Sequence, residues 1–395
     1  MRFRVTLSFF LLLLLSGAAF PVTAQIQLGG LADFELKKGQ NDSSPYVNQT
    51  PNDKWTIYTP YIRIFASADI SENWFISSVL QSDYYSGTEL SSPFFSVINL
   101  NWIPIDDSDF TITAGRFVTP YGVYSNRVLS IDNPFVHLPL THVFGLPVSQ
   151  QSGILPYNAE YEEGITGLTM VNQRMYSQGI LIQNSLGDSD WLQYKLAAAL
   201  APASAYFGTA MYNYPSFTGR IVIQPKIWAQ LGLSFSNGPF MHPDDAANRF
   251  PDSSLSEFRQ ILLGSDLLIS YRYYSFLIEY NRSLWKAPYI NGTETTDYEI
   301  SEAPVDHISG EAVVRFPFFV GSYAAIRYEN LISGSLSSGI YSSGSAWTYD
   351  RSRVELLAGY KLHRNIKMKI SYLLGTDTGP DLNDNVFAVQ LSVAY

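Results

Sequence analysis

The 395-residue sequence contains no cysteine, and only 15% of its residues are charged. Without cysteine, the protein has no disulfide framework, thiolate metal site, catalytic thiol or lipid-modified N-terminal cysteine. In soluble proteins about a quarter of the residues are usually charged, so the content of charged residues is low for a soluble chain. Acidic residues outnumber basic ones and give a formal net charge of −10, which argues against a nucleic-acid partner.

After the apolar stretch near the N-terminus, the sequence has no long apolar run, so no membrane-spanning helix is predicted for the rest of the chain. The N-terminus has a basic start at Arg2 and Arg4, a short apolar stretch over Leu7–Leu15, and the small residues Val22–Ala24. This order is typical of a cleaved secretory signal peptide. We therefore predict a signal peptide over 1–24 and an exported mature chain over 25–395.

Motifs of catalysis and metal binding are scarce as well. No metalloprotease, nucleophile-elbow or phosphate-loop motif occurs, and Pro139 prevents His137 and His142 from forming a helical metal pair. His307 is the best candidate base, but the more ordinary interpretation is a polar residue inside a barrel. The segment 377–385 is rich in oxygen ligands yet lacks the glycine and glutamate positions of a calcium loop. We predict no enzyme activity, no metal and no cofactor.

What the chain does contain is alternation of apolar and polar residues. The last segment places Phe387, Val389 and Leu391 on one face and Gln390 and Ser392 on the other, which is the period of a half-buried strand. The connections between such segments alternate between short turns and long polar loops. Seven short turns and eight long loops predict sixteen strands.

An even number of strands, with short turns at one rim and long loops at the other, is typical of a transmembrane antiparallel β-barrel. A secreted soluble sandwich is the alternative, because it also alternates. Aromatic residues such as Trp74, Trp102, Trp191 and Trp228 gather at strand ends, as in the girdles at the two membrane surfaces. This placement favours a single all-β outer-membrane barrel over 25–395.

These features together resemble a Gram-negative outer-membrane porin. The resemblance rests on the signal peptide, the strand count, the terminal Tyr395 and a long third loop over 118–175, and the segment Gly115–Gly122 is loosely similar to phosphate-selective porins. It implies an outer-membrane location in contact with lipid and a homotrimer. It also implies that Leu391, Val393 and Tyr395 are the signal read by the barrel-assembly machinery.

A sixteen-stranded barrel is wide enough to hold a water-filled channel, so we predict passive diffusion of small polar or anionic solutes. Loop 118–175 is too apolar to remain in water, which favours its folding into the lumen as the constriction. The alternative is a surface loop with a small core of its own. The alternative function is a non-conducting barrel that acts as an adhesin, docking or assembly protein, for which a plugged lumen would be the sign.

Charges opposite the apolar face are predicted to point into the lumen, because a charge at mid-bilayer on the lipid face costs about 2–4 kcal/mol. We predict a basic wall at the constriction, with an acidic loop opposite that sets up a transverse field. In the alternative, Arg327 and Arg351 only pair with Glu329 and Glu355 across the strands. The predicted basic wall is Arg63, Arg327, Arg351 and Arg353, and the predicted acidic loop is Asp132, Glu160, Glu162 and Glu163. Other lumen-facing bases are Lys195, Arg220, Arg315, Lys361, Lys367 and Lys369, and the lumen-facing acids are Asp266, Glu279, Glu311, Glu329 and Glu355.

Overall fold

The computed structural model describes most of the chain. It describes residues 25–40, 54–83, 91–155, 167–187, 190–205, 214–290, 298–337, 346–377 and 385–395. The predicted signal peptide over 1–24 lies outside these residues.

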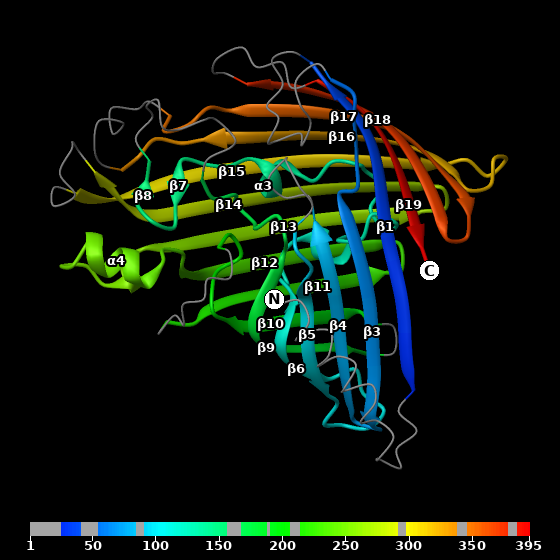
Figure 1. The fold of residues 1–395 in the computed structure, drawn as a ribbon, viewed down its shortest axis with the longest axis horizontal. Coiled ribbons are helices and arrows are strands. Elements are labelled where there is room, and N and C mark those ends of the chain that lie inside the picture. The colour runs from blue at the N-terminus through cyan, green and yellow to red at the C-terminus, as the bar shows by residue number, and fades with distance from the viewer. Residues whose placement is uncertain are drawn as a thin grey trace.

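Sixteen antiparallel strands, counted over the described residues, follow one another around a closed barrel (Figure 1). The first strand closes the barrel by pairing with the last, from Leu31 opposite Ala394 to Gly39 opposite Val386. The predicted antiparallel barrel and its strand number are therefore confirmed. The strands are β1 (Ile26–Gly39), β3 (Tyr61–Ser71), β4 (Trp74–Asp83), β5 (Phe94–Trp102), β6 (Thr111–Val118), β9 (Tyr176–Leu186), β10 (Leu192–Ala199), β11 (Ser216–Lys226), β12 (Ala229–Pro239), β13 (Arg259–Tyr271), β14 (Tyr274–Ile290), β15 (Tyr298–Arg315), β16 (Ser322–Ser333), β17 (Arg351–His363), β18 (Ile366–Asp377) and β19 (Val386–Ala394).

The barrel forms because each strand alternates an apolar outward face with a polar buried one. In β19, Ala388, Gln390 and Ser392 are buried, whereas Val389 and Leu391 between them are more exposed. Similarly, Asn99 and Asn101 of β5 are buried between exposed apolar neighbours. Since side chains of a closed barrel alternate between its interior and its exterior, the exposed apolar face is the one that meets lipid.

Aromatic side chains mark the ends of the strands, as predicted. Trp74 and Trp102 stack with ring centroids 5.5 Å apart beside the short turns that follow β3 and β5. Trp191, Trp228 and Tyr274 are likewise exposed near short turns. An amphipathic ring at the boundary between lipid and water keeps its body in the apolar layer, which fixes the height of this rim in the membrane.

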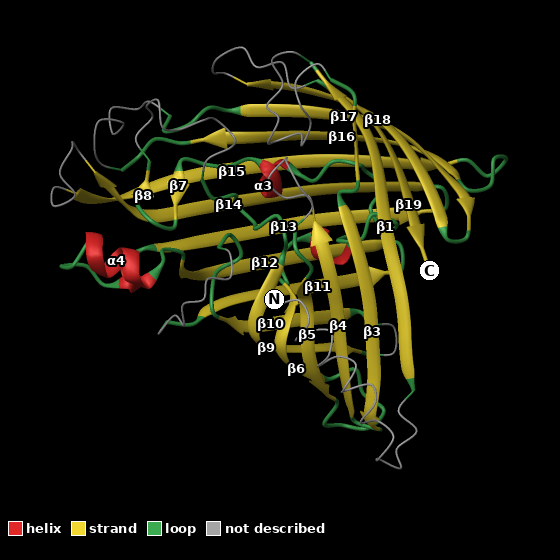
Figure 2. Cartoon of the chain, viewed as in Figure 1, coloured by secondary structure: helices red, strands yellow, loops and turns green. Residues whose placement is uncertain are grey.

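The third long connection runs from residue 119 to residue 175, between β6 and β9. Its described part contains short elements, which are η2 (Val123–Asn126), α3 (Leu140–Val143), β7 (Val148–Ser149) and β8 (Gly153–Ile154). Ile154 of β8 pairs in parallel with Tyr289 of β14, so the connection is fastened to the barrel wall. Figure 2 shows how little helix the protein contains beside its strands.

Three more short elements complete the description. β2 (Thr56–Tyr58) extends β3 beyond Pro60 and pairs with β1, while α4 (Pro243–Arg249) and η3 (Leu255–Glu257) lie in the loop between β12 and β13. Within the described residues, no helix has the length and apolar character needed to cross a membrane.

Candidate channel interior

Two ion pairs bridge the buried faces of β16 and β17. In the register of these strands Arg327 lies opposite Glu355, and Glu329 lies opposite Arg353. Nη2 of Arg327 is 2.7 Å from Oε2 of Glu355, and Nη2 of Arg353 is 2.6 Å from Oε2 of Glu329. All four side chains are at most 3% exposed. Arg327 therefore pairs across the ladder, as in the alternative interpretation, and neither arginine presents an open basic wall to water.

Backbone groups of the third loop cover these ion pairs. The amides of Val136 and His137 donate to Oε1 of Glu355 over 3.1 and 3.3 Å, and the amide of Leu140 donates to Oε1 of Glu329 over 2.9 Å. A buried ion pair compensates for its lost hydration only when further hydrogen bonds satisfy the remaining polar atoms. The loop supplies those bonds, so its docking and the ion pairs stabilise each other.

The same stretch of the loop also contacts buried basic residues of other strands. Nζ of Lys369 donates to the carbonyls of Ser130 and Phe135 over 2.7 and 3.0 Å. Nη1 of Arg63 donates to the carbonyl of Val128 over 3.0 Å. Residues 128–140 of the loop thus lie against the buried face of the barrel wall, and these bases neutralise carbonyl dipoles rather than face water.

Two loop histidines are buried in this contact. Nδ1 of His137 is 3.1 Å from Oε1 of Glu355, yet burial lowers the pKa of His137. Burial also lowers the pKa of His142 to about 3. His307 of β15 is buried too, with Nε2 3.5 Å from Oε1 of Glu329. No cluster of three or more metal-ligating side chains occurs in the described parts of the chain.

Apart from these polar contacts, apolar side chains of several loops form one buried cluster. It joins Leu140, Phe144 and Met170 of the third loop to Phe250 of the fifth loop and Trp285 of β14. The rings of Phe240 and Trp285 are perpendicular, with centroids 5.0 Å apart. The predicted apolar residues of the loop are therefore buried against the barrel and against another loop. The cluster is Tyr121, Leu140, Phe144, Leu146, Val148, Ile154, Leu168, Met170, Val171, Ala201, Ala203, Ala205, Phe240, Met241, Ala246, Phe250, Phe258, Leu262, Trp285, Ala287, Tyr289, Ala303, Val305, Leu331, Leu336 and Trp347.

The opposite side of the barrel holds a polar cavity of about 220 Å³ between the start of the third loop and strands β4, β5, β6, β9 and β10. Its lining includes Asn99, Asn101, Thr113, Gln183 and a single charged residue, Lys195. Nζ of Lys195 is 3.4 Å from the side-chain oxygen of the loop residue Asn126. This side of the interior therefore carries uncharged polar groups and one base.

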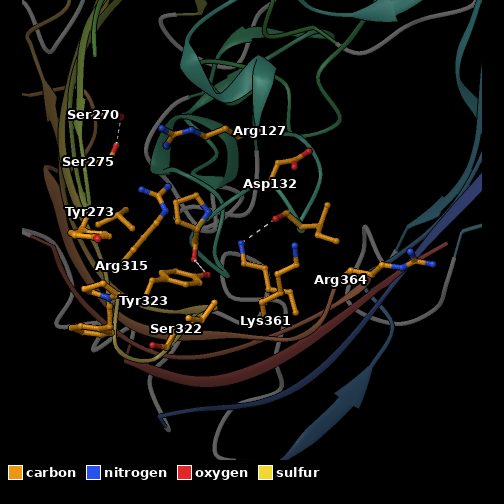
Figure 3. Close-up of a pocket in the computed structure, with 18 of the residues that line it drawn as sticks. Arg127, Asp132, Ser270, Tyr273, Ser275, Arg315, Ser322, Tyr323, Lys361 and Arg364 are labelled. Carbon is orange, nitrogen blue, oxygen red and sulfur yellow. Dashed lines mark hydrogen bonds between the residues drawn. The ribbon is translucent and has the colours of Figure 1, made fainter. Parts of the chain in front are cut away.

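A larger cavity of about 890 Å³ lies at the rim of short turns (Figure 3). The predicted bases Arg315, Lys361 and Lys367 line it, together with Asp132 of the loop. Asp132 is the only one of the four predicted acidic loop residues that is described. It lies near Lys367, which donates to the carbonyl of Ile131 over 3.0 Å.

The remaining predicted residues are dispersed. Arg220 pairs with Asp266 through two contacts of 2.6 and 2.9 Å, and the guanidinium of Arg351 lies 5.1 Å from the ring centroid of Phe144. Tyr395 is exposed at the C-terminal end of β19. Leu391 and Val393 lie on the less buried face of β19, and Glu160, Glu162 and Glu163 lie outside the described residues.

Arg127 is an interior residue that the sequence did not reveal. Its Nη1 is 2.7 Å from Oε2 of Glu311, although the two residues are 184 positions apart. Arg127 follows η2 in an irregular stretch of loop, so no periodicity assigned it to a face. Only the strand partner Glu311 carried a recognisable pattern.

Comparison with solved structures agrees with the barrel fold. The anion-selective porin from Comamonas acidovorans has a TM-score of 0.60 and 7% identity, with 94% of this chain and 99% of that chain covered. OmpF of Salmonella typhi, in complex with daunomycin, has a TM-score of 0.57 and 13% identity, covering 94% of this chain and 98% of that one. The trimer form of OmpT, an outer membrane protein of Vibrio cholerae, has a TM-score of 0.55 and 10% identity, covering 95% of this chain and 100% of that chain.

The chain has the porin fold. No protein-family model matches its sequence, and no curated protein matches it either. Because the identities are this low, the chain resembles these porins in strand number, barrel closure and topology. The interior contacts described above are those of this chain alone.

Proposed function

We propose that the protein is a porin-like channel of the outer membrane that lets small polar solutes, anions in particular, diffuse through a restricted passage. The observation that carries the proposal is the charge of the two cavities inside a closed barrel. Among the described residues, Lys195 is the only charged one that lines the smaller cavity, and the larger one is lined by several bases and by one acid, Asp132. A field of one sign at close quarters attracts anions and repels cations.

The third loop forms the constriction in this proposal. Residues 128–140 cover the buried face of β16 to β18, so solute passes on the other side, between the start of the loop and strands β4 to β10. The Ser125–Asn126 stretch of the loop and Lys195 of β10 line that side. The passage is accordingly narrower than the barrel.

The cellular setting is part of the same proposal. The exposed apolar belt fits a bilayer, and the resemblance to porins supports an outer-membrane location after export by a signal peptide over 1–24. A homotrimer is supported by the trimer form of one structural neighbour. We further propose that Leu391, Val393 and the exposed Tyr395 act as the signal for the barrel-assembly machinery.

Planar-bilayer recording of the purified protein tests the channel. We expect single-channel currents and a reversal potential in a KCl gradient that favours chloride. Lys195→Glu should shift that potential toward potassium, while Lys226→Glu at the exposed end of β11 should leave it unchanged. Absence of current from correctly folded protein would end the proposal.

A second candidate function is favoured by the buried apolar cluster. The side chains of loops three and five join Trp285 and Leu331 of the wall in one buried apolar cluster. A filled lumen was the feature expected of a non-conducting barrel that works through its loops as an adhesin, docking or assembly protein. The same recording decides between the two functions.

A further inference from the structure

The cavity at the short-turn rim is built by parts of the chain that are distant in sequence. Its wall comes from strands β13 to β18 and the turns between them, and its cover comes from loop residues 127 to 134. In Figure 3 the side chain of Arg315 extends toward Arg127, and that of Lys361 points toward the loop segment that carries Asp132. Arg364 extends away from both. Three basic groups thus converge on one space of about 890 Å³.

The charge of this space is not balanced by the protein. Arg127 pairs with Glu311 at 2.7 Å, and Lys367 has Asp132 nearby. By contrast, Arg315 and Lys361 are exposed and form no ion pair with any residue in the described ranges. Two basic head groups that face one space repel each other when the described lining supplies a single carboxylate, Asp132, and an anion between them removes that repulsion.

The rest of the lining is apolar or carries hydroxyl groups. Leu268, Val313, Phe316 and Ile366 supply apolar surface beside the bases. The hydroxyl of Tyr323 donates to the carbonyl of Pro134 over 2.9 Å, which fixes that ring against the loop. Ligand sites typically combine such apolar walls with a few convergent polar groups, in volumes of about 300–1,000 Å³.

We propose that this cavity, at the short-turn mouth of the channel, binds an organic anion, such as a carboxylate or sulfonate with an apolar body. The anionic group lies between Arg315 and Lys361, and the body covers Val313, Phe316 and Ile366. A small inorganic anion contacts only the head groups and leaves the apolar wall in water. This inference deepens the proposed function, because it names the class of solute.

Titration calorimetry on the purified full-length protein in detergent tests the site with naphthalene-2-sulfonate as the probe. We expect saturable binding that weakens as salt rises, and at least tenfold weaker binding of inorganic sulfate. Arg315→Gln with Lys361→Gln should weaken binding of the probe at least tenfold, while Arg315→Lys with Lys361→Arg should retain most of it. The matched control is Lys226→Gln with Arg272→Gln, two exposed bases near short turns and outside the cavity, which should bind as the unchanged protein does.

The site is overturned if binding is not saturable, if the double glutamine variant binds as tightly as the control, or if sulfate binds as tightly as the probe. The variants are compared only after their folded electrophoretic mobility matches that of the unchanged protein. Current in a bilayer without saturable binding overturns the site and leaves the channel in place. Saturable binding without current supports the site and overturns the channel.

Discussion

Arg327 holds the third loop and the barrel wall together through its contact with Glu355. Its Nη2 is 2.7 Å from Oε2 of Glu355 and 2.8 Å from the carbonyl oxygen of His137. The guanidinium also lies 4.6 Å from the ring centroid of Phe135. One buried arginine therefore joins a carboxylate of the wall to the backbone and an aromatic ring of the loop, so the loop docks only while the ion pairs are intact.

Replacing Arg353 with alanine should release this part of the loop. The change removes one partner of Glu329 and the hydrogen bond to the carbonyl of Leu138, while Nε of Arg327 stays 3.2 Å from Oε2 of Glu329. Removing one member of a buried pair typically costs about 3–5 kcal/mol, and the remaining contact with Arg327 keeps the loss near the lower end of that range. We expect faster hydrogen exchange at 136–140 and a larger single-channel conductance.

The control for that variant is Arg282→Ala, because Arg282 forms an exposed pair with Asp306 at 3.5 Å. Exposed pairs contribute about 0–1 kcal/mol, so exchange and conductance should stay as they were. Equal exchange rates at 136–140 in both variants would contradict the role assigned to the buried pairs.

The strands of the barrel could be predicted because their chemistry is local. The alternation of apolar and polar residues in 387–395 and in Phe94–Trp102 indicates directly which side of each strand meets lipid. The number of strands follows from the alternation of short turns and long loops.

The interior could not be predicted in the same way, because its contacts join distant residues. Arg327 and Arg353 lie on the buried face of the wall, and no pattern in the sequence predicts the loop backbone that covers them. Whether a lumen-facing base meets water or a carbonyl depends on where residues 128–140 lie. No periodicity encodes that position, and the predicted acids Glu160, Glu162 and Glu163 remain untested.

Replacing Phe144 with alanine should loosen the apolar cluster. Phe144 is fully buried and its ring lies beside the guanidinium of Arg351. Truncating a buried phenylalanine costs about 3–5 kcal/mol when the surroundings cannot collapse into the space. We expect increased protease cleavage within the third loop and a larger conductance. Phe319→Ala removes an exposed ring on a short turn and should change neither property.

Placing arginine on the lipid-facing side of a strand should show how far the exposed apolar surface of the barrel extends along that strand. Leu233 is half exposed at the middle of β12, and Ile227 is exposed in the short turn that precedes that strand. Leu233→Arg should lower the free energy of unfolding in phospholipid vesicles by about 2–4 kcal/mol, and Ile227→Arg by about 0–1 kcal/mol. Denaturant titration followed by tryptophan fluorescence gives both values. Equal losses at the two positions would place the turn within the apolar layer.

Acid should weaken the docking of the third loop through His142. Burial holds the pKa of His142 at about 3 in the docked loop, whereas an exposed histidine titrates near 6.5. Between these values the undocked loop binds more protons than the docked one, so docking weakens as pH falls below about 6.5 and is unaffected above it. We expect conductance to rise between pH 7 and pH 4. His142→Gln removes this titration and should reduce the rise, while His363→Gln, which changes an exposed histidine near a short turn, should keep it. The difference between the two variants isolates the contribution of His142. Identical pH profiles for the two variants would contradict the role assigned to His142.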